Sequence, residues 1–457
     1  MNINRFFSNS KNLMKLAYPI LIAQLIQNLM GFADTVMAGR VSATDMAAVA
    51  VASSVWLPLI LAISGLIMAL ASIISQLSGA NQFDNIAKAS YQTAWIAVFF
   101  SIIIIILYYI ATPLLIDSIA MEPELKQLMF DYLGYIVWGG PGYCLYLVLR
   151  NYSEGLSFSR PTMIISILGL LINIPANYIF IYGEFGMPAL GGAGCGLATA
   201  IVYWVMFVGM LAYAYYSKHL KQAPLFTQFY WPQWSEIKVI LALGTPIAFS
   251  LLFEVSLFAA VAIILIPFGA NVVASHQIAI NFSGLVFMVP LSLAMAVTIK
   301  VGFEVGNKNL EKAKELCRYS VILGLIIAVA TAAATLIFKT QIAAIYTSDT
   351  EVLELAAGLM FLAALFQFSD AIQVISAGAL RGYKDTKSIL YITFFSYWVV
   401  GLSFGLILGL TDWIAPASGP YGFWIGFISG LTVAAVLLAW RLKVVQNRFD
   451  QQAALAS

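Results

Sequence analysis

The stretch KLAYPILIAQLIQNLMGFADTVMAGR, Lys15 to Arg40, sets the fold class of this chain. It is mostly apolar over more than the roughly 20 residues that a helix needs to cross a bilayer core. Because Gln24, Gln27 and Asn28 interrupt it and no small-residue cleavage site follows, we interpret it as a retained first helix and not as a signal peptide. Asp34 lies inside this span, with no basic residue within one helical turn. A carboxylate there costs roughly 2.5 to 3.5 kcal/mol, so we expect it to be functional or held by a partner.

The composition of the whole chain agrees with a membrane protein. The 457 residues are 61% hydrophobic and only 10% charged, whereas about a quarter of an ordinary globular protein is charged. The apolar runs reach the length of membrane helices and lack the ten-residue alternation of a membrane barrel. We therefore expect an all-α polytopic membrane protein. The net charge of +2 says little about partners, because the side on which the charges lie matters more than their sum. We expect no nucleic-acid partner.

The residues of common enzymes and metal sites do not form recognisable patterns. Cys144, Cys195 and Cys317 are widely spaced, with no CxxC pair, so neither a disulfide framework nor a metal site is indicated. His219 and His276 are far apart, and no GxxxxGK[ST] phosphate loop occurs. We expect no catalytic residues, no enzymatic activity and no cofactor. A channel is also disfavoured, because isolated acids do not form a ring.

Apolar runs between polar segments predict twelve transmembrane helices. Their approximate ranges are 14–38, 52–77, 91–114, 128–149, 161–183, 193–216, 237–266, 276–301, 316–338, 352–377, 388–410 and 420–441. If both termini lie on one side, 20 of the 23 basic residues lie on that side, and only Arg40, Lys126 and Lys339 on the other. The positive-inside rule then predicts that both termini are cytoplasmic.

The two halves of the chain are related by a repeat. A shift of 227 residues brings LAYPI (Leu16 to Ile20) onto LGTPI (Leu243 to Ile247). Because each half has an even number of spans, the repeat is parallel, as in transporters with a shared cavity between two lobes. We predict two six-helix lobes, residues 1–216 and 237–457, joined by a cytoplasmic linker at 217–236. The linker could equally be a simple tether.

Three acids fall inside predicted spans: Asp34, Glu254 and Asp370. Under the 227-residue shift Glu254 corresponds to Gln27, and Asp34 follows Gln27 by seven residues, or about two helical turns on nearly one face. The equivalent first helices of both lobes thus present acids on equivalent faces. Intramembrane acids without basic partners are typical of cation coupling, by Na⁺ or by H⁺.

Two asparagines are candidates for the same chemistry as Asp34. Asn173 and Asn177 lie four residues apart on either side of Pro175, which frees a backbone carbonyl in mid-helix. With Asp34 they could complete an oxygen-lined site, although a plain helix–helix contact explains them equally well. The glycine-rich clusters at 191–196 and 419–426 are interpreted as close packing or helix starts. RGYKDT, Arg381 to Thr386, is interpreted as a cytoplasmic anchor or gate contact.

Six motifs together carry a family resemblance. They are GFADTVMAG (31–39), NIPANYIFIYG (173–183), GGAGCGLATAIVYW (191–204), FEVSLFA (253–259), SHQIAINFS (275–283) and LRGYKDT (380–386). In this order they resemble the NorM branch of the multidrug and toxic compound extrusion (MATE) family, from about residue 12 to 443. The resemblance implies a two-lobed exporter of drugs across the bacterial inner membrane in exchange for Na⁺ or H⁺. From the three acids and the 14% aromatic content we expect the substrates to be lipophilic cationic drugs and dyes, and we expect a monomer among membrane lipids.

The resemblance also implies roles for individual residues. Glu254 and Asp370 match the acids assigned to cation binding, with Na⁺ as the candidate metal ion, and Asp34 matches a polar cluster with the two asparagines. One position departs from the pattern. Phe366 stands where the NorM pattern has a tyrosine, so one hydroxyl near the expected ion site is lost.

A drug/H⁺ antiporter of the major facilitator type is the alternative, because it also has twelve spans and a parallel repeat. Against it, the loop LSGANQFDNIAKAS, Leu77 to Ser90, lacks the Gly/Asp/Arg-rich signature of that class.

Overall fold

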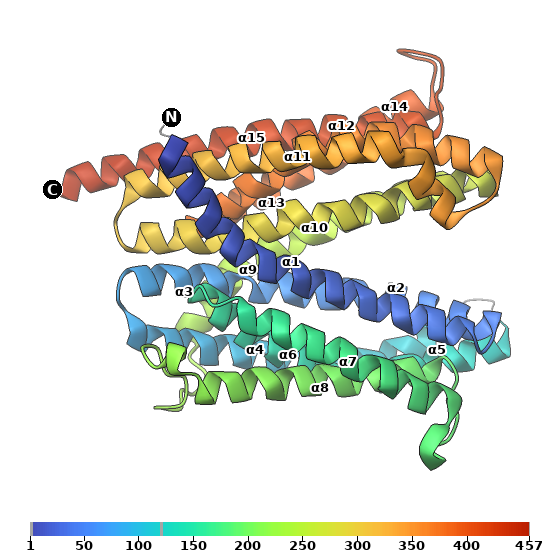
Figure 1. Ribbon diagram of the computed structural model, residues 1–457, viewed down its shortest axis with the longest axis horizontal. Coiled ribbons are helices and arrows are strands. Elements are labelled where there is room, and N and C mark those ends of the chain that lie inside the picture. The colour runs from blue at the N-terminus through green and yellow to red at the C-terminus, as the bar shows by residue number, and fades with distance from the viewer. Residues whose placement is uncertain (1–2, 119–121, 457) are drawn as a thin grey trace. The chain divides into compact units, whose positions relative to one another are not determined.

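The computed structural model describes residues 3–118 and 122–456, and within these ranges every regular element is helical (Figure 1). A helix pairs its backbone N–H and C=O groups within the segment, and this is needed in a bilayer because lipid cannot form hydrogen bonds with them. The all-α membrane fold is confirmed. Eleven of the helices are long and apolar enough to span a bilayer in this part of the chain.

The fourth predicted span, 128–149, is not among these eleven, because it is a helix interrupted near its middle. α5 (Pro123–Ile136) leads through the short 3₁₀ turn η1 (Val137–Gly139) into α6 (Gly140–Gly155). Neither half alone has the length of a membrane span. The interruption falls at Gly139 and Gly140, just before Pro141, where the sequence favours a break in the helix.

The chain divides into two compact units. The N unit is Tyr18–Ala248, and the C unit is Met1–Ala17 with Phe249–Ser457. The first and ninth helices, α1 (Ile3–Gly39) and α9 (Trp234–Ile264), therefore each contribute to both units. The domain boundaries predicted above fall close to these limits without coinciding with them, and they remain a proposal.

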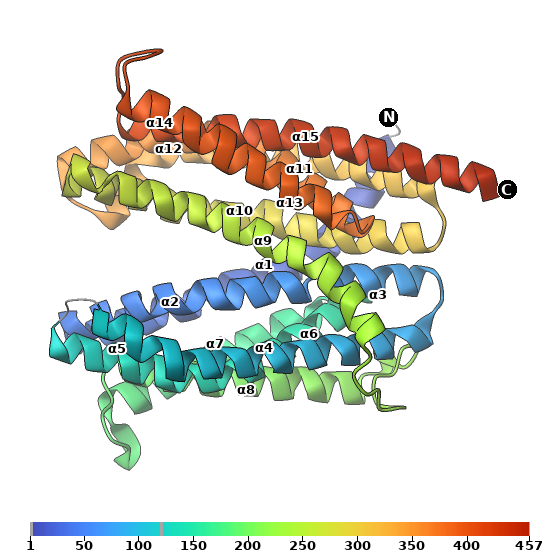
Figure 2. The same cartoon turned by 180° about the vertical axis from the view of Figure 1, so that it is seen from behind.

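The N unit is built from the rest of α1 and the helices that follow it. These are α2 (Ala43–Ile67), α3 (Ala69–Gly79), α4 (Phe83–Ser118), α5, α6, α7 (Arg160–Tyr182) and α8 (Ala193–Tyr216), with the short turns η2 (Glu184–Gly186) and η3 (Lys218–Leu220). α8 packs against α5, α6 and α7, and α6 also packs against α4. Figure 2 shows the same unit from behind.

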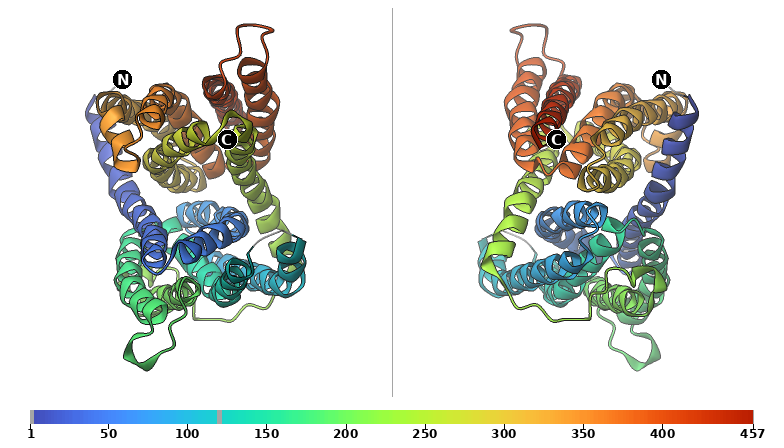
Figure 3. Two further views of the ribbon diagram at one scale, coloured as in Figure 1. Left: turned by 90° about the vertical axis from the view of Figure 1, so that its right-hand side faces the viewer. Right: turned by 90° about the vertical axis from the view of Figure 1, so that its left-hand side faces the viewer.

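The C unit continues from α9 through the short η4 (Ile266–Phe268). It contains α10 (Ala270–Gly306), α11 (Leu310–Tyr346), α12 (Thr350–Gly382), α13 (Thr386–Phe394), η5 (Phe395–Leu402), α14 (Ser403–Leu410) and α15 (Pro420–Ala456). α12 is its central helix and packs against α10, α11 and α15. The segment η5 is π-helical, with a wider turn than the α-helices on either side. Seen end-on in Figure 3, the helices within each unit form a bundle.

Capping side chains fix where several helices begin. The Ser42 hydroxyl accepts from the backbone N–H of Asp45 at 2.9 Å and starts α2. Asn309 accepts from the backbone N–H of Lys312 at 3.3 Å at the start of α11. Asp349 accepts from the backbone N–H of Glu351 at 2.9 Å and starts α12. Each cap satisfies an N–H group that has no partner within its own helix.

The glycine-rich clusters provide close helix contacts, as expected from the sequence. A Cβ on Gly196 of α8 would lie 2.5 Å from the Tyr132 carbonyl oxygen of α5. In the C unit, a Cβ on Gly426 of α15 would lie 2.6 Å from the backbone of Gly401 and Gly405. Small residues let helix backbones approach in this way in membranes, where no hydrophobic force drives helices together.

Two charged residues assigned to a loop by the sequence are buried. α6 continues to Gly155, so Arg150 and Glu154 lie inside the N unit, where Arg150 Nε and Glu154 Oε1 are 2.8 Å apart. The loop assignment was wrong because the apolar run ends at Leu149, whereas neighbouring helices cover α6 for one turn more. The pair is internal to one helix, at i and i+4.

The linker segment before α9 is attached to the N unit. The Gln92 side chain donates to the Trp231 carbonyl at 2.9 Å, and Trp95 Nε1 donates to the Tyr230 carbonyl at 3.1 Å. The Tyr152 hydroxyl donates to the Ala223 carbonyl at 2.6 Å. The linker is therefore bound along α4 and α6 and is more than a tether.

Replacing Gly196 by alanine should destabilise the protein by roughly 1–3 kcal/mol, because the added methyl group meets a backbone carbonyl that cannot move aside. Gly209→Ala on the same helix is the matched control, since its nearest neighbour would lie at an ordinary 3.6 Å. Thermal unfolding of both purified variants in one detergent tests this. Equal melting temperatures for the two variants would contradict the packing argument.

Candidate functional site

Asp34 lies at the centre of a hydrogen-bonded cluster in the N unit. The residue is only 5% exposed, and its Oδ1 accepts from Asn173 Nδ2 at 3.1 Å and from Asn177 Nδ2 at 2.6 Å. The Thr199 hydroxyl donates to the other oxygen, Oδ2, at 2.9 Å. The structure thus brings together all three residues that the sequence predicted for this site and adds a fourth.

The cluster binds a carboxylate without any basic residue. Three donors from α7 and α8 meet one acid of α1, and hydrogen bonds to a charged acceptor are stronger than neutral ones. Among the described residues, no lysine or arginine forms an ion pair with Asp34. The cluster can therefore hold a negative charge, and protonation or a bound cation would change its hydrogen bonds.

Asn177 keeps one unsatisfied group in this cluster. Its nitrogen also donates to Asn173 Oδ1 at 3.2 Å, while its own Oδ1 is buried with no hydrogen-bond partner. A buried acceptor without a partner costs about 1–3 kcal/mol. Together with the carboxylate, this oxygen could ligate a cation, as expected for an oxygen-lined site.

Thr199 was not found by sequence reasoning. It lies one helical turn after Cys195, whose thiol donates to the Asp34 backbone carbonyl at 3.4 Å. The signal was its position in the GGAGCGLATA segment, where α8 approaches its neighbours closely. Hydroxyl side chains are common within membrane spans, so the residue type alone did not indicate a functional site.

The C-unit acids lie in a less satisfied environment. Asp370 on α12 is 2% exposed, and its Oδ1 is buried without a hydrogen-bond partner. Glu254 on α9 lies within electrostatic range of Asp370. Both predicted acids thus belong to the C unit, while Asp34 belongs to the other unit.

Phe366 and Asp370 line the same narrow cavity in the C unit, which also includes Ser283 and Gln367. Phe366 is buried and packs edge-on against Trp424, with ring centroids 6.3 Å apart. Phe366 and Asp370 are one helical turn apart on α12. A hydroxyl at position 366 would thus lie on the wall of the cavity that contains the carboxylate.

The π-helical segment η5 contacts both acid-bearing helices. Gln373 of α12 donates to the Tyr397 hydroxyl at 2.6 Å. The next residue, Trp398, donates its ring N–H to the carbonyl of Phe253 at 3.2 Å, directly before Glu254. Adjacent side chains of η5 therefore fix α12 and α9 close to the two acids.

Arg381 is a further charged residue of this site that sequence reasoning placed elsewhere. α12 continues to Gly382, so Arg381 is buried in the C unit and interacts electrostatically with Glu254. The expectation that Glu254 has no basic residue near it was wrong. The apolar run in the sequence ends before Arg381, but the helix does not.

The rest of the RGYKDT turn is an anchor, as predicted. Arg441 of α15 pairs with Asp385, Nε to Oδ2 at 2.7 Å, and Tyr383 packs against Phe449 with ring centroids 5.2 Å apart. Lys384 has a left-handed φ of 62°, and burial lowers the pKa of its amine. These contacts join the end of α12 to α15.

Removing the Thr199 hydroxyl should destabilise the N unit. We expect Thr199→Val to lower the free energy of unfolding by roughly 1–3 kcal/mol, because a buried carboxylate loses one of three donors. Thr199→Ser keeps the donor and serves as the control. Unfolding of the purified variants is the measurement, and a valine variant as stable as the serine variant would remove Thr199 from the cluster.

Comparison with protein-family models identifies the family. The MatE model matches residues 19–179 and again 246–407, so the two matches begin 227 residues apart (246 − 19). This confirms the internal repeat. It also excludes the major facilitator alternative.

Curated relatives are similar over nearly the whole chain. The probable multidrug resistance protein NorM of Shewanella oneidensis is 50% identical over 438 residues, covering 96% of this chain and 95% of that protein. The multidrug resistance protein MdtK of Photorhabdus laumondii is 50% identical over 449 residues, covering 98% of each.

Solved structures show the same fold at lower identity. A MATE protein crystallised in a bent conformation gives a TM-score of 0.88 at 21% identity, over 98% of this chain and 97% of that one. The eukaryotic MATE transporter AtDTX14 gives 0.84 at 18% identity, over 98% and 99%. With both segments of its family model matched and relatives half identical along its length, this chain belongs to the MATE family of membrane transporters.

Proposed function

We propose that this protein exports lipophilic organic cations by secondary active antiport, in exchange for Na⁺ or H⁺. Family membership and relatives named as multidrug resistance proteins support multidrug export. The proposals of a cationic substrate and of a coupling ion rest on two buried acids. Each unit buries a carboxylate that forms no ion pair among the described residues, Asp34 in the N unit and Asp370 in the C unit.

These carboxylates favour positive ligands. Buried acids in a span are typical of ion pathways and proton relays. The chain is also 14% aromatic, and a desolvated cation gains from aromatic ring faces as well as from carboxylates. Among the described residues no cluster of three His, Cys, Asp or Glu side chains could hold a metal ion, so a Na⁺ site at Glu254 and Asp370 would need carbonyl, amide or water oxygens as well.

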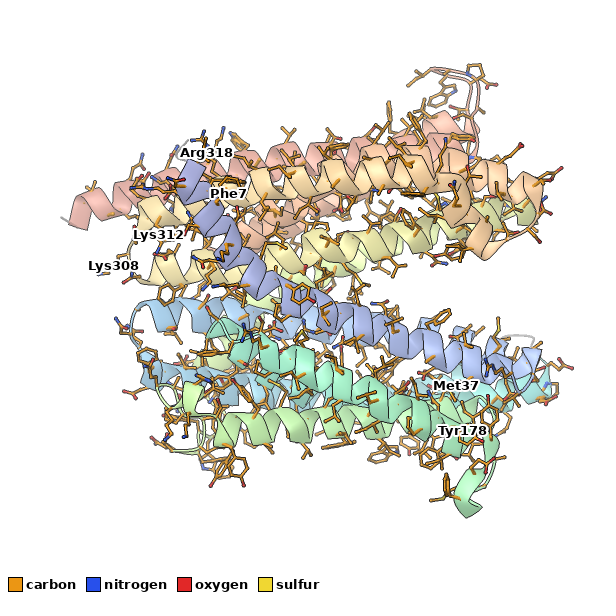
Figure 4. All side chains as sticks on the ribbon, in the orientation of Figure 1. Phe7, Met37, Tyr178, Lys308, Lys312 and Arg318 are labelled. Atoms are coloured by element: carbon orange, nitrogen blue, oxygen red, sulfur yellow. The ribbon has the colours of Figure 1, made fainter. Side chains whose placement is uncertain are left out.

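The proposed location is the bacterial inner membrane, with both termini cytoplasmic and the protein working as a monomer surrounded by lipid. In the C unit, α1 begins and α15 ends at the same end (Figure 1). Figure 4 shows Phe7, Lys308, Lys312 and Arg318 at this end of the C unit. Its basic residues favour the cytoplasmic side.

The test is export by everted vesicles under separately imposed ion gradients. We expect a cationic dye such as ethidium to be transported when either a Na⁺ or a pH gradient is applied, and an anionic dye of similar size to be ignored. Equal transport of both dyes would refute the cationic substrate class. Transport that needs ATP and ignores both gradients would refute antiport.

Neutralising the C-unit acids should stop exchange while leaving the protein folded. Asp370→Asn and Glu254→Gln are isosteric, so insertion and melting temperature should stay close to those of the parent, whereas gradient-driven export should fall at least about tenfold. Glu354→Gln, at an exposed position of the same helix as Asp370, is the control. Normal export by the two test variants would show that these acids are not coupling residues.

Restoring a hydroxyl at position 366 should strengthen the response to Na⁺. Phe366→Tyr adds one oxygen to the cavity that contains Asp370, and carboxylate and hydroxyl oxygens suit a hard cation. We expect half-maximal export at a Na⁺ concentration several-fold lower, measured by a sodium titration at fixed pH. Phe361→Tyr, on the exposed side of α12, should change nothing. If both tyrosine variants behave alike, position 366 does not face the ion.

A further inference from the structure

The linker that follows α8, residues 217–236, has two apolar sides. On the inner side, Leu220 and Leu225 are buried and pack into the hydrophobic core of the N unit. On the outer side, Phe229 and Trp231 are 53% and 71% exposed. The protein therefore covers the inner apolar side of the linker, whereas the outer side lies open in the part of the chain that the structure describes.

The exposed rings belong to a cluster that joins the linker to α4. Trp95 of α4 stacks on Trp231, with ring centroids 6.4 Å apart and ring planes at 11°. Phe229 lies edge-on to Trp231 at 5.2 Å and to Tyr91 at 5.4 Å. Together with Tyr230, which lies 5.8 Å from Tyr91, these residues form what we term the aromatic cluster. Stacked and edge-to-face contacts favour one arrangement of the rings, so the cluster is a preformed surface.

Polar contacts hold the backbone of the linker against α4. The side chain of Gln92 donates to the carbonyl of Trp231 at 2.9 Å and accepts from the backbone N–H of Gln233 at 2.8 Å. One turn before Gln92, Lys88 pairs its Nζ with Glu236 Oε1 at 2.8 Å. Burying the exposed rings inside the protein would require these contacts to break. The open side of the linker is thus a stable feature of the fold.

The aromatic cluster continues into an exposed apolar face of α4. Phe99 follows Trp95 by one turn, and Ile102 and Ile106 follow at helical spacing, all three of them exposed. This stretch of α4 is long and apolar enough to span a membrane. In a bilayer, lipid covers the exposed face of such a span. The aromatic cluster therefore lies at the end of a lipid-facing stripe, where Trp and Tyr rings are enriched in membrane proteins.

The charges of the linker favour an anionic surface. Residues 217–235 contain no acid, and the acid that follows them, Glu236, is paired with Lys88. Lys218 and Lys221 are exposed, and neither forms an ion pair with any residue that the structure describes. Basic side chains beside a membrane attract anionic lipid headgroups. Apolar rings and unpaired lysines on one segment are therefore complementary to an anionic bilayer surface.

We propose that the linker is an interfacial anchor that binds anionic phospholipids. The outer rings of the aromatic cluster lie among the lipid headgroups, and Lys218 and Lys221 contact their phosphate groups. With the proposed orientation this is the cytoplasmic leaflet. The MatE model matches residues 19–179 and 246–407, so the linker lies outside both matched segments. The anchor does not depend on the proposed transport function.

A spin label on the linker of the full-length protein tests the proposal in lipid vesicles. Gln228→Cys places the label at an exposed position directly before Phe229, and the three native cysteines are buried. Asn307→Cys, at an exposed position in the polar turn between α10 and α11, is the matched control for a label in water. The parent protein, treated with the same reagent, reports any labelling of native cysteines.

Each labelled protein is reconstituted in phosphatidylcholine alone and in equal parts of phosphatidylcholine and phosphatidylglycerol. The measurement is the ratio of the label's collision rates with O₂, which concentrates in lipid, and with a water-soluble nickel chelate. We expect this ratio at position 228 to be several-fold higher in the vesicles that contain phosphatidylglycerol. At position 307 it should be low in both.

Removing the outer rings should move the label into water. In the Gln228→Cys background, Phe229→Ser combined with Trp231→Ser should lower the ratio to that of the label at 307, because serine has no apolar area to bury in the leaflet. Phe185→Ser is the control, since this ring in η2 is 86% exposed and lies outside the linker. It should leave the ratio at 228 unchanged.

Removing the linker charges should abolish the preference for anionic lipid. With Lys218→Gln and Lys221→Gln together, the ratio at position 228 should be the same in both lipid compositions. Lys308→Gln, at an exposed position outside the linker, should preserve the difference. Because all three lysines are exposed, the melting temperatures of these variants should stay at the parent value.

Three outcomes would overturn the anchor. The first is a label at 228 that meets the nickel chelate as often as the label at 307 does, in both lipid compositions. The second is equal burial in both compositions without any effect of the lysine variants, which would rule out anionic lipid as the ligand. The third is a label that is exposed to water in the vesicles but protected in native membranes, which would assign the surface to a protein partner. The export assay tests the proposed antiport separately.

Discussion

A carboxylate buried among membrane helices must find donors within the protein, because lipid offers none. In the N unit this requirement joins three helices at one point. Asp34 of α1 is held by Asn173 and Asn177 of α7 and by Thr199 of α8. Any event that changes the charge of this group must also change the contacts between those helices. The site is thus part of the packing of the N unit.

The C unit meets the same requirement differently. Asp370 keeps an unpaired oxygen, Glu254 has a buried arginine within electrostatic range, and several polar atoms along α12 lack partners, including Gln367 Oε1 and Gln373 Oε1. A buried polar group without a partner is costly, because the low-dielectric interior does not replace the hydrogen bonds that it made with water. The repeat thus produced two related folds with different internal chemistry. Three donors hold the N-unit carboxylate, whereas one oxygen of Asp370 has no hydrogen-bond partner.

The sequence was sufficient for the fold and for the acids but not for their partners. Long apolar runs predict spans well, and an acid inside one stands out, as Asp34 and Asp370 did. The i, i+4 asparagines around Pro175 were visible for the same reason. Arg381 and the Arg150–Glu154 pair were missed because a charge ends an apolar run in the sequence, whereas a helix inside a bundle continues wherever neighbours cover it. Thr199 was missed because its hydroxyl has no distinctive spacing.

The π-helical segment η5 gives one span of the C unit a local change of register. In an ordinary α-helix, one added residue rotates everything after it by about 100°, which would turn a packing face away from its neighbour. Here the wide turn absorbs the extra residue between Phe395 and Leu402, and the glycines of α14 still meet α15. A lineage could therefore gain or lose a residue in this turn and re-aim Tyr397 without rebuilding the glycine contact. The π-helical turn is thus the position in this span where the number of residues can change while the packing against α15 is kept.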